Sequence, residues 1–555
     1  MKNLRRSISA LFALCFLATL SSNANGAAQV PKDIVKMKPY VSTAKMGFTT
    51  KNEVTMARNA YAKVQALGNM SYVPVGDWLF DPKCNAKSLK PDADTSDMKK
   101  VNLPYEWGKD SSGLFRTNFT MPETINGFPN SGSSVYLAFE GTATIDVFIN
   151  GKRAKSFTGS GELDVTDVIK PGESVTLGVK VTDLTQRGRL GSVRIHASSL
   201  DSLKQPVDEI LNRLESARLL SDQLPAKQKP LIEAVSAVAK DADALKNEKD
   251  LAKVKASLAK MKSQLAIVDK MIADYPTFNQ GPYLQNVKPN EITVMWETRV
   301  PAASAVYYGK NALDNVVSDP KPVTVHKVIL KGLEQQTEYK YLAVTNKLAA
   351  PESTFRTSIK RDTPFKFVVW SDNQSNPTVF EPIVDQIIKN KPDIGISVGD
   401  VVGHGGTYEL WAKEYFFPLR RLIINTPTFN AIGNHEYGGF SCGKPEIWYD
   451  AFFSHPGNND YYFAVTYGNS RFIMLNQQEE IGCSEPSPGS KQYEWLLKEL
   501  ESEEYKKADF HFVFFHKPPY SQCWSGGYYD GEPSARTNLV PLIEKYGIDI
   551  VFSGH

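Results

Sequence analysis

The chain has 555 residues, about twice the length at which one hydrophobic core stops growing, so we expect several domains. Its 41% hydrophobic and 23% charged residues are ordinary for a globular protein and exclude a disordered, collagen-like or polytopic membrane chain. The formal net charge is +3, an excess that Lys2, Arg5 and Arg6 supply. Because the rest of the chain is close to neutral, we expect no nucleic-acid-binding surface.

Residues 1–26 have the pattern of a signal peptide. The three cations precede an apolar run from Ile8 to Leu20, and small and polar residues follow it. The run is shorter than the about 20 apolar residues that span a bilayer, and no second long apolar stretch follows. We therefore predict a secreted or periplasmic protein without a membrane anchor. The alternative is a buried N-terminal helix.

Residues 27–68 show no clear pattern and form a lead-in. Strand and turn patterns follow over residues 69–200, where Val175, Leu177, Val179 and Val181 alternate with other residues. The Asn150-Gly151 pair is typical of a tight hairpin turn. These patterns predict a β-sandwich with one buried face.

Two stretches of this β-sandwich carry a resemblance. They are VYLAFEGTATIDVFINGKRAKSFTG at 135–159 and GELDVTDVIKPGESVTLGVKV at 161–181. Both resemble the galactose-binding-like jelly roll that serves as the sugar-binding domain of family 2 glycoside hydrolases. The resemblance implies a carbohydrate ligand, and the alternative is a structural sandwich without a ligand.

Residues 201–276 change to a helical pattern. An earlier helix carries Val207, Ile210, Leu211 and Leu214, and a later one has apolar residues that step alternately by three and four. The later apolar seam consists of Leu251, Val254, Leu258, Met261, Leu265, Val268 and Ile272. We predict a helical hairpin or three-helix spacer, with a dimerising coiled coil as the alternative.

A second β module is predicted over residues 278–358. Ile292, Val294 and Trp296 alternate in it, within the stretch GPYLQNVKPNEITVMWET at 281–298. That stretch, with TEYKYLAV at 337–344, resembles the fibronectin-type-III-like domain that precedes the catalytic domain of purple acid phosphatases. The resemblance implies a scaffold.

Residues 363–555 repeat one sequence pattern, in which a short apolar strand is followed by a polar residue that is able to bind metal. The strand ends carry Asp372 with Gln374, Asp400, Asn434 with His435, His516, and His555. A helix expected over residues 377–390 makes the segment between the first two aspartates a βαβ unit. Open α/β sheets bind ligands beyond the carboxyl ends of their strands, so these residues predict a metal site.

The motifs GD, GNHE at 433–436, a strand-terminal His and a final GH occur in this order. They resemble the calcineurin-like metallophosphoesterase superfamily, and with the preceding β module the chain is similar to purple acid phosphatases. The resemblance implies an αββα domain in which Asp400 bridges two metals. Asp372 and Gln374 would then belong to the first metal, and Asn434, His516 and His555 to the second. His435 would face the phosphoryl group or the leaving oxygen.

These residue types suit phosphoester hydrolysis, which needs a hydroxide at neutral pH and a clamp on the phosphoryl oxygens. Two divalent cations about 3.5–4 Å apart supply both, and a shared carboxylate such as Asp400 holds such a pair. Oxygen and nitrogen ligands leave manganese, iron and zinc open. The hydroxide would attack phosphorus in line with the departing alkoxide, and His435 would donate a proton or hydrogen bond to it.

Three departures from the family pattern stand out. Purple acid phosphatases carry a tyrosine ligand three residues after the bridging aspartate, and Gly403 stands there. Many other members have a histidine at the position of Gln374, whose amide is a weaker ligand. The family pattern ends in Gly-His-x-His, whereas this sequence stops at His555, which predicts a domain truncated at its C-terminal end.

The remaining histidines and cysteines receive plainer interpretations. His404 is expected to make a loop contact, with metal ligation as the alternative. His455 and His511 are expected on the surface or on strands, with an approach of His455 to substrate as the alternative, and His196 and His326 have no assigned role. Outside the signal peptide the cysteines are Cys84, Cys442, Cys483 and Cys523, and one disulfide is expected among the last three.

The sequence therefore predicts an exported, two-metal phosphoesterase that hydrolyses phosphomonoesters of small molecules. A phosphodiesterase or nucleotide hydrolase is the runner-up within the same class. The competing class is a sugar-binding surface protein whose phosphoesterase domain is degenerate. Gln374 and the missing last histidine favour that class, and Asp400, Asn434, His435 and His516 argue against it.

Overall fold

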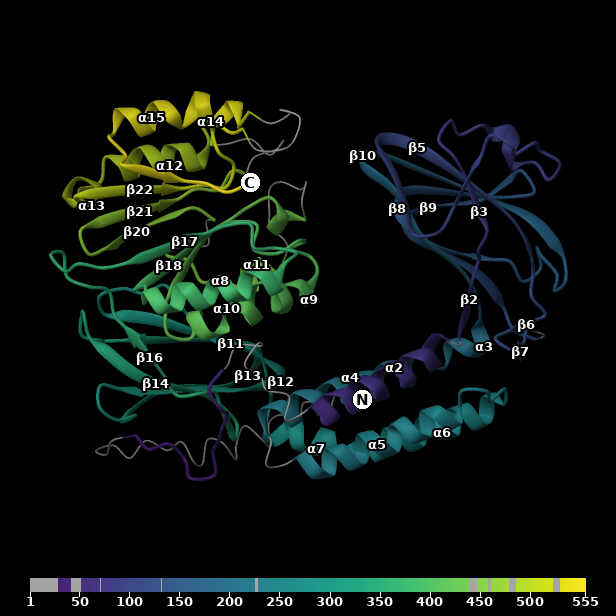
Figure 1. Ribbon diagram of the computed structural model, residues 1–555, viewed down its shortest axis with the longest axis horizontal. Coiled ribbons are helices and arrows are strands. Elements are labelled where there is room, and N and C mark those ends of the chain that lie inside the picture. Colours follow the sequence, from purple (N-terminus) through teal and green to yellow (C-terminus); the bar gives the residue numbers. More distant parts are fainter. Residues whose placement is uncertain are drawn as a thin grey trace. The chain divides into compact units, whose positions relative to one another are not determined.

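The computed structural model divides into two compact units (Figure 1). Unit 1 contains residues 1–49, 222–225 and 270–555, and unit 2 contains residues 50–221 and 226–269. The residues that the structure describes are 28–40, 51–69, 71–130, 132–224, 228–438, 445, 447–457, 461–478, 486–522 and 530–555. Unit 2 is thus inserted into the chain of unit 1, so the order of modules is not the simple succession that the sequence suggests.

Unit 2 contains a seven-stranded antiparallel sheet. Its order is β4-β3-β5-β10-β8-β9, and β2 pairs with β10. The strands are β2 (Tyr72–Pro74), β3 (Trp78–Asp81), β4 (Lys99–Val101), β5 (Tyr105–Thr120), β8 (Val135–Ile149), β9 (Lys152–Asp164) and β10 (Ser174–Ala197). Asn150 and Gly151 join β8 to β9 with φ of 48° and 81°, as the predicted tight turn requires. The sheet is consistent with the predicted β-sandwich, and its jelly-roll type stays a prediction.

The helices of unit 2 correct the sequence interpretation in two places. They are α2 (Lys51–Asn69), α3 (Ser198–Asp201), α4 (Lys204–Gln223), α5 (Gln228–Ala244), α6 (Leu251–Gln264) and α7 (Ala266–Asp274), the last of which runs into unit 1. Helix α2 lies in the lead-in and packs on α5, with Ala60, Val64 and Leu67 buried. The predicted seam belongs to two helices, because α6 ends at Gln264. Its apolar residues from Val254 onward are nevertheless buried.

The β module of unit 1 also begins earlier in the chain than expected. Strand β1 (Val35–Lys36) pairs in parallel with β15 (Leu348–Ala349), and Ala28, Val30 and Ile34 pack on the module's core. The other strands are β11 (Phe278–Gln285), β12 (Glu291–Gly309), β13 (Asn315–Lys331), β14 (Glu338–Thr345) and β16 (Ser353–Arg356). Part of the lead-in therefore belongs to this module, whose fibronectin type stays a prediction.

The last part of unit 1 has helix, sheet, sheet and helix layers (Figure 1). Its first sheet contains the parallel strands β17 (Phe367–Trp370), β18 (Ile394–Val398) and β19 (Thr428–Ala431), and the pair Gln285–Thr428 joins it to β11. Its second sheet has the order β20-β21-β22-β23, with β20 (Phe463–Tyr467), β21 (Ser470–Met474), β22 (Phe510–Phe514) and β23 (Ile550–Phe552). Helix α8 (Pro377–Asn390) connects β17 to β18, so the predicted βαβ unit is confirmed.

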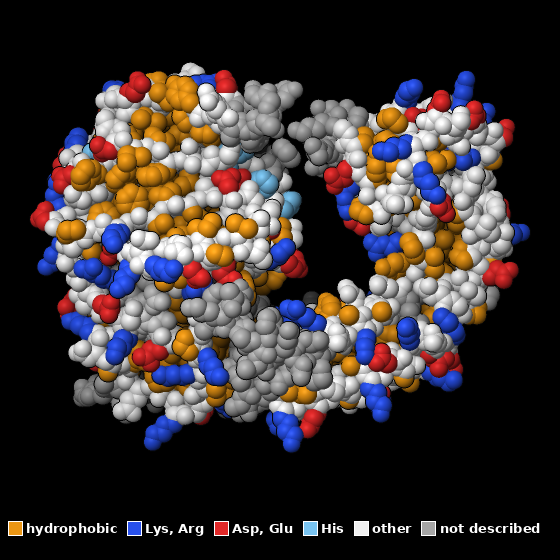
Figure 2. Space-filling model, in the orientation of Figure 1, with side chains coloured by type: hydrophobic (Ala, Val, Ile, Leu, Met, Phe, Trp, Pro, Cys, Tyr) orange, Lys and Arg blue, Asp and Glu red, His pale blue; other side chains and the backbone are white. Residues whose placement is uncertain are grey.

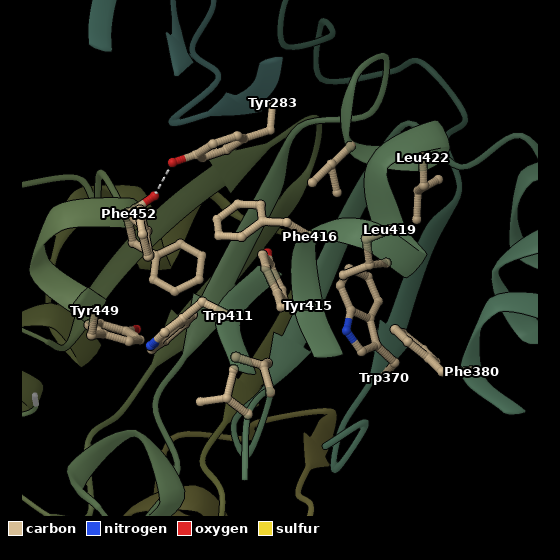
Figure 3. Close-up of a cluster of buried hydrophobic side chains, with 14 of the residues drawn as sticks. Tyr283, Trp370, Phe380, Trp411, Tyr415, Phe416, Leu419, Leu422, Tyr449 and Phe452 are labelled. Atoms are coloured by element: carbon tan, nitrogen blue, oxygen red, sulfur yellow. Dashed lines mark hydrogen bonds between the residues drawn. The ribbon is translucent and has the colours of Figure 1, made fainter. Parts of the chain in front are cut away.

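Two hydrophobic clusters attach helices to the outer faces of these sheets. One cluster joins α8 and α10 (Phe417–Ile423) to β17 and to a π-helical turn (Trp411–Phe416), with Phe380, Trp411 and Leu419 buried (Figure 3). The other joins α12 (Lys491–Leu500), α14 (Pro533–Asn538) and α15 (Val540–Lys545) to β21 and β22. Short helices at 408–410, 447–452 and 503–507 complete the domain. The rigid sheets fix where their carboxyl ends lie.

Candidate metal centre

The site lies just beyond the carboxyl ends of five strands. Asp372 follows β17, Asp400 follows β18, and Asn434 follows β19 in the first sheet. In the second sheet His516 follows β22 and His555 follows β23. Because β17, β18 and β19 are parallel, their carboxyl ends share one edge. Histidine side chains reach the surface together at one edge of unit 1 (Figure 2).

The glycines of the motifs allow the strand ends to approach one another closely. Gly399 has φ of 87°, and a Cβ there would lie 2.5 Å from the backbone nitrogen of Gly433. A Cβ on Gly433 would collide with the Asp400 carboxylate, and one on Gly554 would collide with Asp372. A side chain at any of these positions would push the candidate ligands apart, which gives GD, GN and GH a steric cause.

Asp400, His516 and His555 form a compact cluster of metal-binding groups. One ligand atom from each lies within 4.8 Å of the other two. The His516 Nε2 lies 2.9 Å from the Asp400 Oδ2 and 3.3 Å from the His555 Nδ1. The other His516 ring nitrogen, Nδ1, lies 2.8 Å from the Val398 carbonyl, so it carries the proton and Nε2 is left for a metal.

The electrostatics of this cluster follow from its burial. Burial favours a higher pKa for Asp400, but the hydrogen bond and positive charge of His516 outweigh it and hold that pKa below its usual value. Burial likewise opposes protonation of His516, whereas the Asp400 carboxylate raises the pKa of His516. Burial and the neighbouring His516 lower the pKa of His555 to about 4. An anionic carboxylate beside two imidazoles is a donor set that suits a transition metal.

Asp372 and Gln374 adjoin this cluster. The Asp372 Oδ2 accepts a hydrogen bond of 3.0 Å from the backbone nitrogen of His555, so the first strand end meets the last. The Oε1 of Gln374 is buried and has no hydrogen-bond partner among the described residues. A buried amide oxygen without a partner is costly unless something else binds it, and a cation would do so. These residues therefore fit a metal ion.

His435 lies beside the cluster with its ring partly open to solvent. Its backbone nitrogen donates to the Asp400 Oδ1 at 2.9 Å, and its Nδ1 lies 2.6 Å from the Gly403 carbonyl oxygen. That carbonyl can only accept, so Nδ1 carries the proton. The Nε2, 3.8 Å from the Asp400 Oδ2, is the nitrogen that can face a substrate. The buried Asn434 precedes His435 directly.

Glu436 also belongs to this site, although no role for it follows from the sequence motifs. Its carboxylate is fully buried and accepts the backbone N–H groups of Asp400 at 2.9 Å, Val401 at 2.8 Å and Gly433 at 2.7 Å. Burial and the Asp400 charge raise the pKa of Glu436 to about 7. Glu436 thus ties the turn after β18 to the turn after β19, and its place as the last letter of GNHE was the available signal.

The expected departure at Gly403 has a structural counterpart. The Gly403 N–H donates to the Glu414 Oε2 at 2.6 Å, and Glu414 is a buried residue of the π-helical turn. A Cβ on Gly403 would lie 3.5 Å from that oxygen and 3.6 Å from the Ser375 Oγ. Residue 403, where the resemblance implies a tyrosine, therefore lies close to Glu414 and Ser375.

The other histidines lie outside the cluster. His404 is exposed and its Nδ1 accepts the Gly406 N–H at 3.2 Å, which agrees with a loop contact. His455 is half-buried in a loop, not on a strand; its ring stacks on Phe463, and burial lowers its pKa to about 3. His511 lies on β22, as expected. His196 and His326 are buried in their β modules.

The expected disulfide cannot be placed, because Cys442, Cys483 and Cys523 lie outside the described residues. Cys84, a half-buried residue of unit 2, is a free thiol. Residues 1–26, the predicted signal peptide, also lie outside the described range. None of the helices that the structure describes is long and apolar enough to span a bilayer.

The layered domain and its Asp/His cluster at the strand ends are those of a metallophosphoesterase. Residues 365–555 match the model of the calcineurin-like phosphoesterase family, so this part of the chain is a calcineurin-like phosphoesterase domain. Relatives of the chain include purple acid phosphatases. One is probable purple acid phosphatase 20 of Arabidopsis thaliana, which is 22% identical over 308 residues, 51% of this chain and 68% of that protein.

Other relatives match shorter parts. Purple acid phosphatase 23 of Arabidopsis thaliana is 25% identical over 266 residues, 42% of this chain and 56% of that protein. Probable inactive purple acid phosphatase 27 of the same plant is 28% identical over 192 residues, 31% of this chain and 30% of that protein. A solved purple acid phosphatase, PPD1 from yellow lupin (Lupinus luteus) seeds, is 21% identical with a TM-score of 0.43, covering 49% of this chain and 57% of that one.

Proposed function

We propose that this protein is an exported, metal-dependent phosphoesterase that hydrolyses phosphomonoesters at a two-metal site. The observation that carries the proposal is the cluster of Asp400, His516 and His555, whose ligand atoms lie within 4.8 Å of one another at the ends of three strands. A carboxylate and two imidazoles clustered in this way indicate a metal site. The match to the phosphoesterase family indicates phosphorylated substrates.

Each residue has a role in this proposal. Asp400 would bridge the two ions, with Asp372 and Gln374 on the first and Asn434, His516 and His555 on the second. When bound, the metals supply a hydroxide nucleophile at neutral pH and positive charge against the phosphoryl oxygens, and manganese, iron and zinc all suit these ligands. His435 would present Nε2 toward the substrate. Because the Gly403 carbonyl accepts the Nδ1–H, only the doubly protonated ring has an Nε2–H that it can donate to the departing oxygen.

A second candidate is a domain that has lost its activity. Relatives named as probable inactive purple acid phosphatases support it, as does Gln374, whose amide is a weaker ligand than an imidazole. A phosphodiesterase or nucleotide hydrolase would use the same cluster on another substrate. Carbohydrate binding by unit 2 and export by residues 1–26 stay predictions.

The test is a parallel assay of the purified chain on a phosphomonoester, a phosphodiester and a nucleoside triphosphate. Manganese, iron and zinc are supplied in turn, and a chelator-treated sample is the control. Metal-dependent turnover that is fastest on the monoester supports the proposal. Faster turnover of the diester or the triphosphate would identify that compound class, and not phosphomonoesters, as the substrate. The absence of turnover on all three favours the inactive domain.

A further inference from the structure

A partly buried hydrogen bond links the β module of unit 1 to the segment that follows Asp400. The Tyr408 Oη donates to the Glu297 Oε2 at 2.6 Å and accepts the Asn279 Nδ2 at 3.0 Å. Glu297 lies on β12, Asn279 on β11, and Tyr408 in the phosphoesterase domain. The Glu297 side chain is buried, and the Tyr408 ring packs on Trp448, with ring centres 4.9 Å apart.

A buried carboxyl at this place needs a reason, because an apolar side chain would bury at lower cost. Burial raises the pKa of Glu297, and the hydrogen bonds from Tyr408 and Asn279 oppose that rise. The carboxyl fixes where the Tyr408 hydroxyl lies, because a strong acceptor at 2.6 Å specifies both distance and direction. An apolar contact would hold the ring but not the hydroxyl.

Tyr408 follows Thr407 directly in the chain, and hydrogen bonds within the preceding loop lead from Thr407 back to His435. The loop concerned is residues 403–407, called here the 403–407 loop. The Thr407 N–H donates to the His404 carbonyl at 3.0 Å, and the Gly405 N–H donates to the His435 carbonyl at 2.8 Å. The Trp411 Nε1 holds the Gly405 carbonyl at 2.8 Å. The Gly403 carbonyl, at the start of the loop, accepts the Nδ1 proton of His435.

These contacts make the orientation of His435 depend on the loop. The Gly403 carbonyl selects which ring nitrogen of His435 carries the proton, and hence which one faces the substrate. A shift of the loop would weaken that bond and turn the ring, although His435 itself would be unchanged. Misplacement of a catalytic group by about 1 Å can cost about 100-fold in rate.

We propose that Glu297 is a positioning residue for catalysis, which acts through the Tyr408 hydroxyl and the 403–407 loop to hold His435 in its productive orientation. The proposal rests on the proposed function of the site. In this proposal the β module helps to orient a catalytic side chain, whereas the sequence resemblance implied only a scaffold.

The experiment compares Tyr408→Phe with Tyr283→Phe in the full chain. Each change removes one tyrosine hydroxyl that donates a hydrogen bond, since the Tyr283 Oη donates to the Phe452 carbonyl at 2.7 Å in the neighbouring cluster (Figure 3). Tyr283 donates to a residue outside the 403–407 loop, so it controls for loss of a hydrogen bond as such. Steady-state kinetics on a phosphomonoester, metal content and backbone hydrogen exchange of the 403–407 peptide are measured for both. Glu297→Gln and Glu297→Ala complete the set.

We expect Tyr408→Phe to lower kcat at least about 10-fold with KM and metal content unchanged, and to speed hydrogen exchange in the 403–407 loop. Tyr283→Phe should leave kcat and that exchange rate within about twofold of the wild type. Glu297→Gln, whose amide oxygen can still accept the hydroxyl, should retain more kcat than Glu297→Ala.

Equal effects of the two tyrosine variants on kcat would overturn the proposal, as would faster exchange with an unchanged kcat. Failure of the proposed function is a separate result, in which the wild type itself hydrolyses none of the substrates. In that case the exchange rates decide: unchanged exchange in Tyr408→Phe overturns the link to the loop, and faster exchange supports it.

Discussion

The Glu436 carboxylate accepts the backbone N–H of Asp400 at 2.9 Å. Glu436 is a buried acid outside the predicted ligand set, and it fixes the backbone of the proposed ligand Asp400. The same carboxylate holds Val401 and Gly433, and with them the turns after β18 and β19. Two carboxylates so close together, one buried completely, are stable only where backbone donors and cations compensate their charge. The candidate metal centre therefore includes Glu436, which holds the backbone beside the proposed ligand Asp400.

Glu436→Gln should weaken metal binding. The amide presents an NH2 group where a carboxylate oxygen accepts backbone N–H groups, so at least one donor loses its partner. We expect metal affinity to fall about 10–100-fold, as for other residues that orient ligands, measured by competition with a chelator. Glu499→Gln is the control, since Glu499 forms an ion pair of 2.6 Å with Arg471. This pair does not belong to the candidate site at the carboxyl ends of the strands. An equal loss of affinity in the control would contradict the assignment.

Asp400→Asn and His516→Ala should each reduce phosphomonoester hydrolysis at least about 100-fold, because each removes a metal ligand. His511→Ala serves as the control. His511 lies on the same strand, β22, and its Nε2 contacts the Tyr505 carbonyl at 2.9 Å. The His511 variant should keep its kcat. Unchanged turnover in either ligand variant would contradict the proposed site.

Gly399→Ala should damage the metal centre sterically. The added Cβ would lie 2.5 Å from the Gly433 nitrogen and 2.9 Å from the His516 Nδ1, and the backbone φ of 87° disfavours any side chain. Gly547→Ala has a comparable φ of 65° but nothing within 4 Å of its Cβ. We expect bound metal to be lost only in Gly399→Ala, whereas Gly547→Ala should cost about 1–2 kcal/mol of stability. Normal metal content in Gly399→Ala would refute the packing argument.

His326 should make unit 1 sensitive to acid. Burial lowers the pKa of His326 to about 3, although the Asp319 charge opposes this, and the ring contacts the Ser304 Oγ at 2.7 Å and the Thr298 Oγ1 at 2.8 Å. A depressed pKa in the folded state contributes stability above the unfolded value of about 6.5, and this stability is lost as the pH falls toward 3.

The pH prediction is tested by comparing wild type with His326→Gln in urea unfolding at pH 7 and pH 5. Because glutamine does not titrate, the wild type should lose about 2 kcal/mol more of its free energy of unfolding over this interval. The comparison cancels the contribution of His455, whose lowered pKa is common to both proteins. Equal losses in the two proteins would contradict the prediction.

The sequence was most informative where the signal is local. An apolar strand followed by a polar residue marks a strand end, so the sequence alone predicts that Asp372, Asp400, His516 and His555 lie at one edge. The helix at 377–390 also followed from its local pattern. Gly399 and Gly433 were visible as letters of motifs, but the contacts that require them appear only in three dimensions.

What the sequence could not predict depends on contacts between distant segments. Strand β1 consists of two residues and is defined by its pairing with β15, more than 300 residues later, so no periodicity reveals it. The seam of α6 and α7 kept its spacing through the break at Leu265, because burial continues across it. Glu297 and Tyr408 are separated by 111 residues, and neither belongs to a recognisable motif.

The most direct test of the account is the metal content of the purified chain and of Asp400→Asn, by elemental mass spectrometry with manganese, iron and zinc all supplied during expression. The account predicts up to two bound ions per wild-type chain and a clear loss in the variant, because Asp400 is the ligand proposed to bridge both ions and clusters with His516 and His555. A wild-type chain that folds but binds no metal, or a variant that binds as much as the wild type, would contradict it.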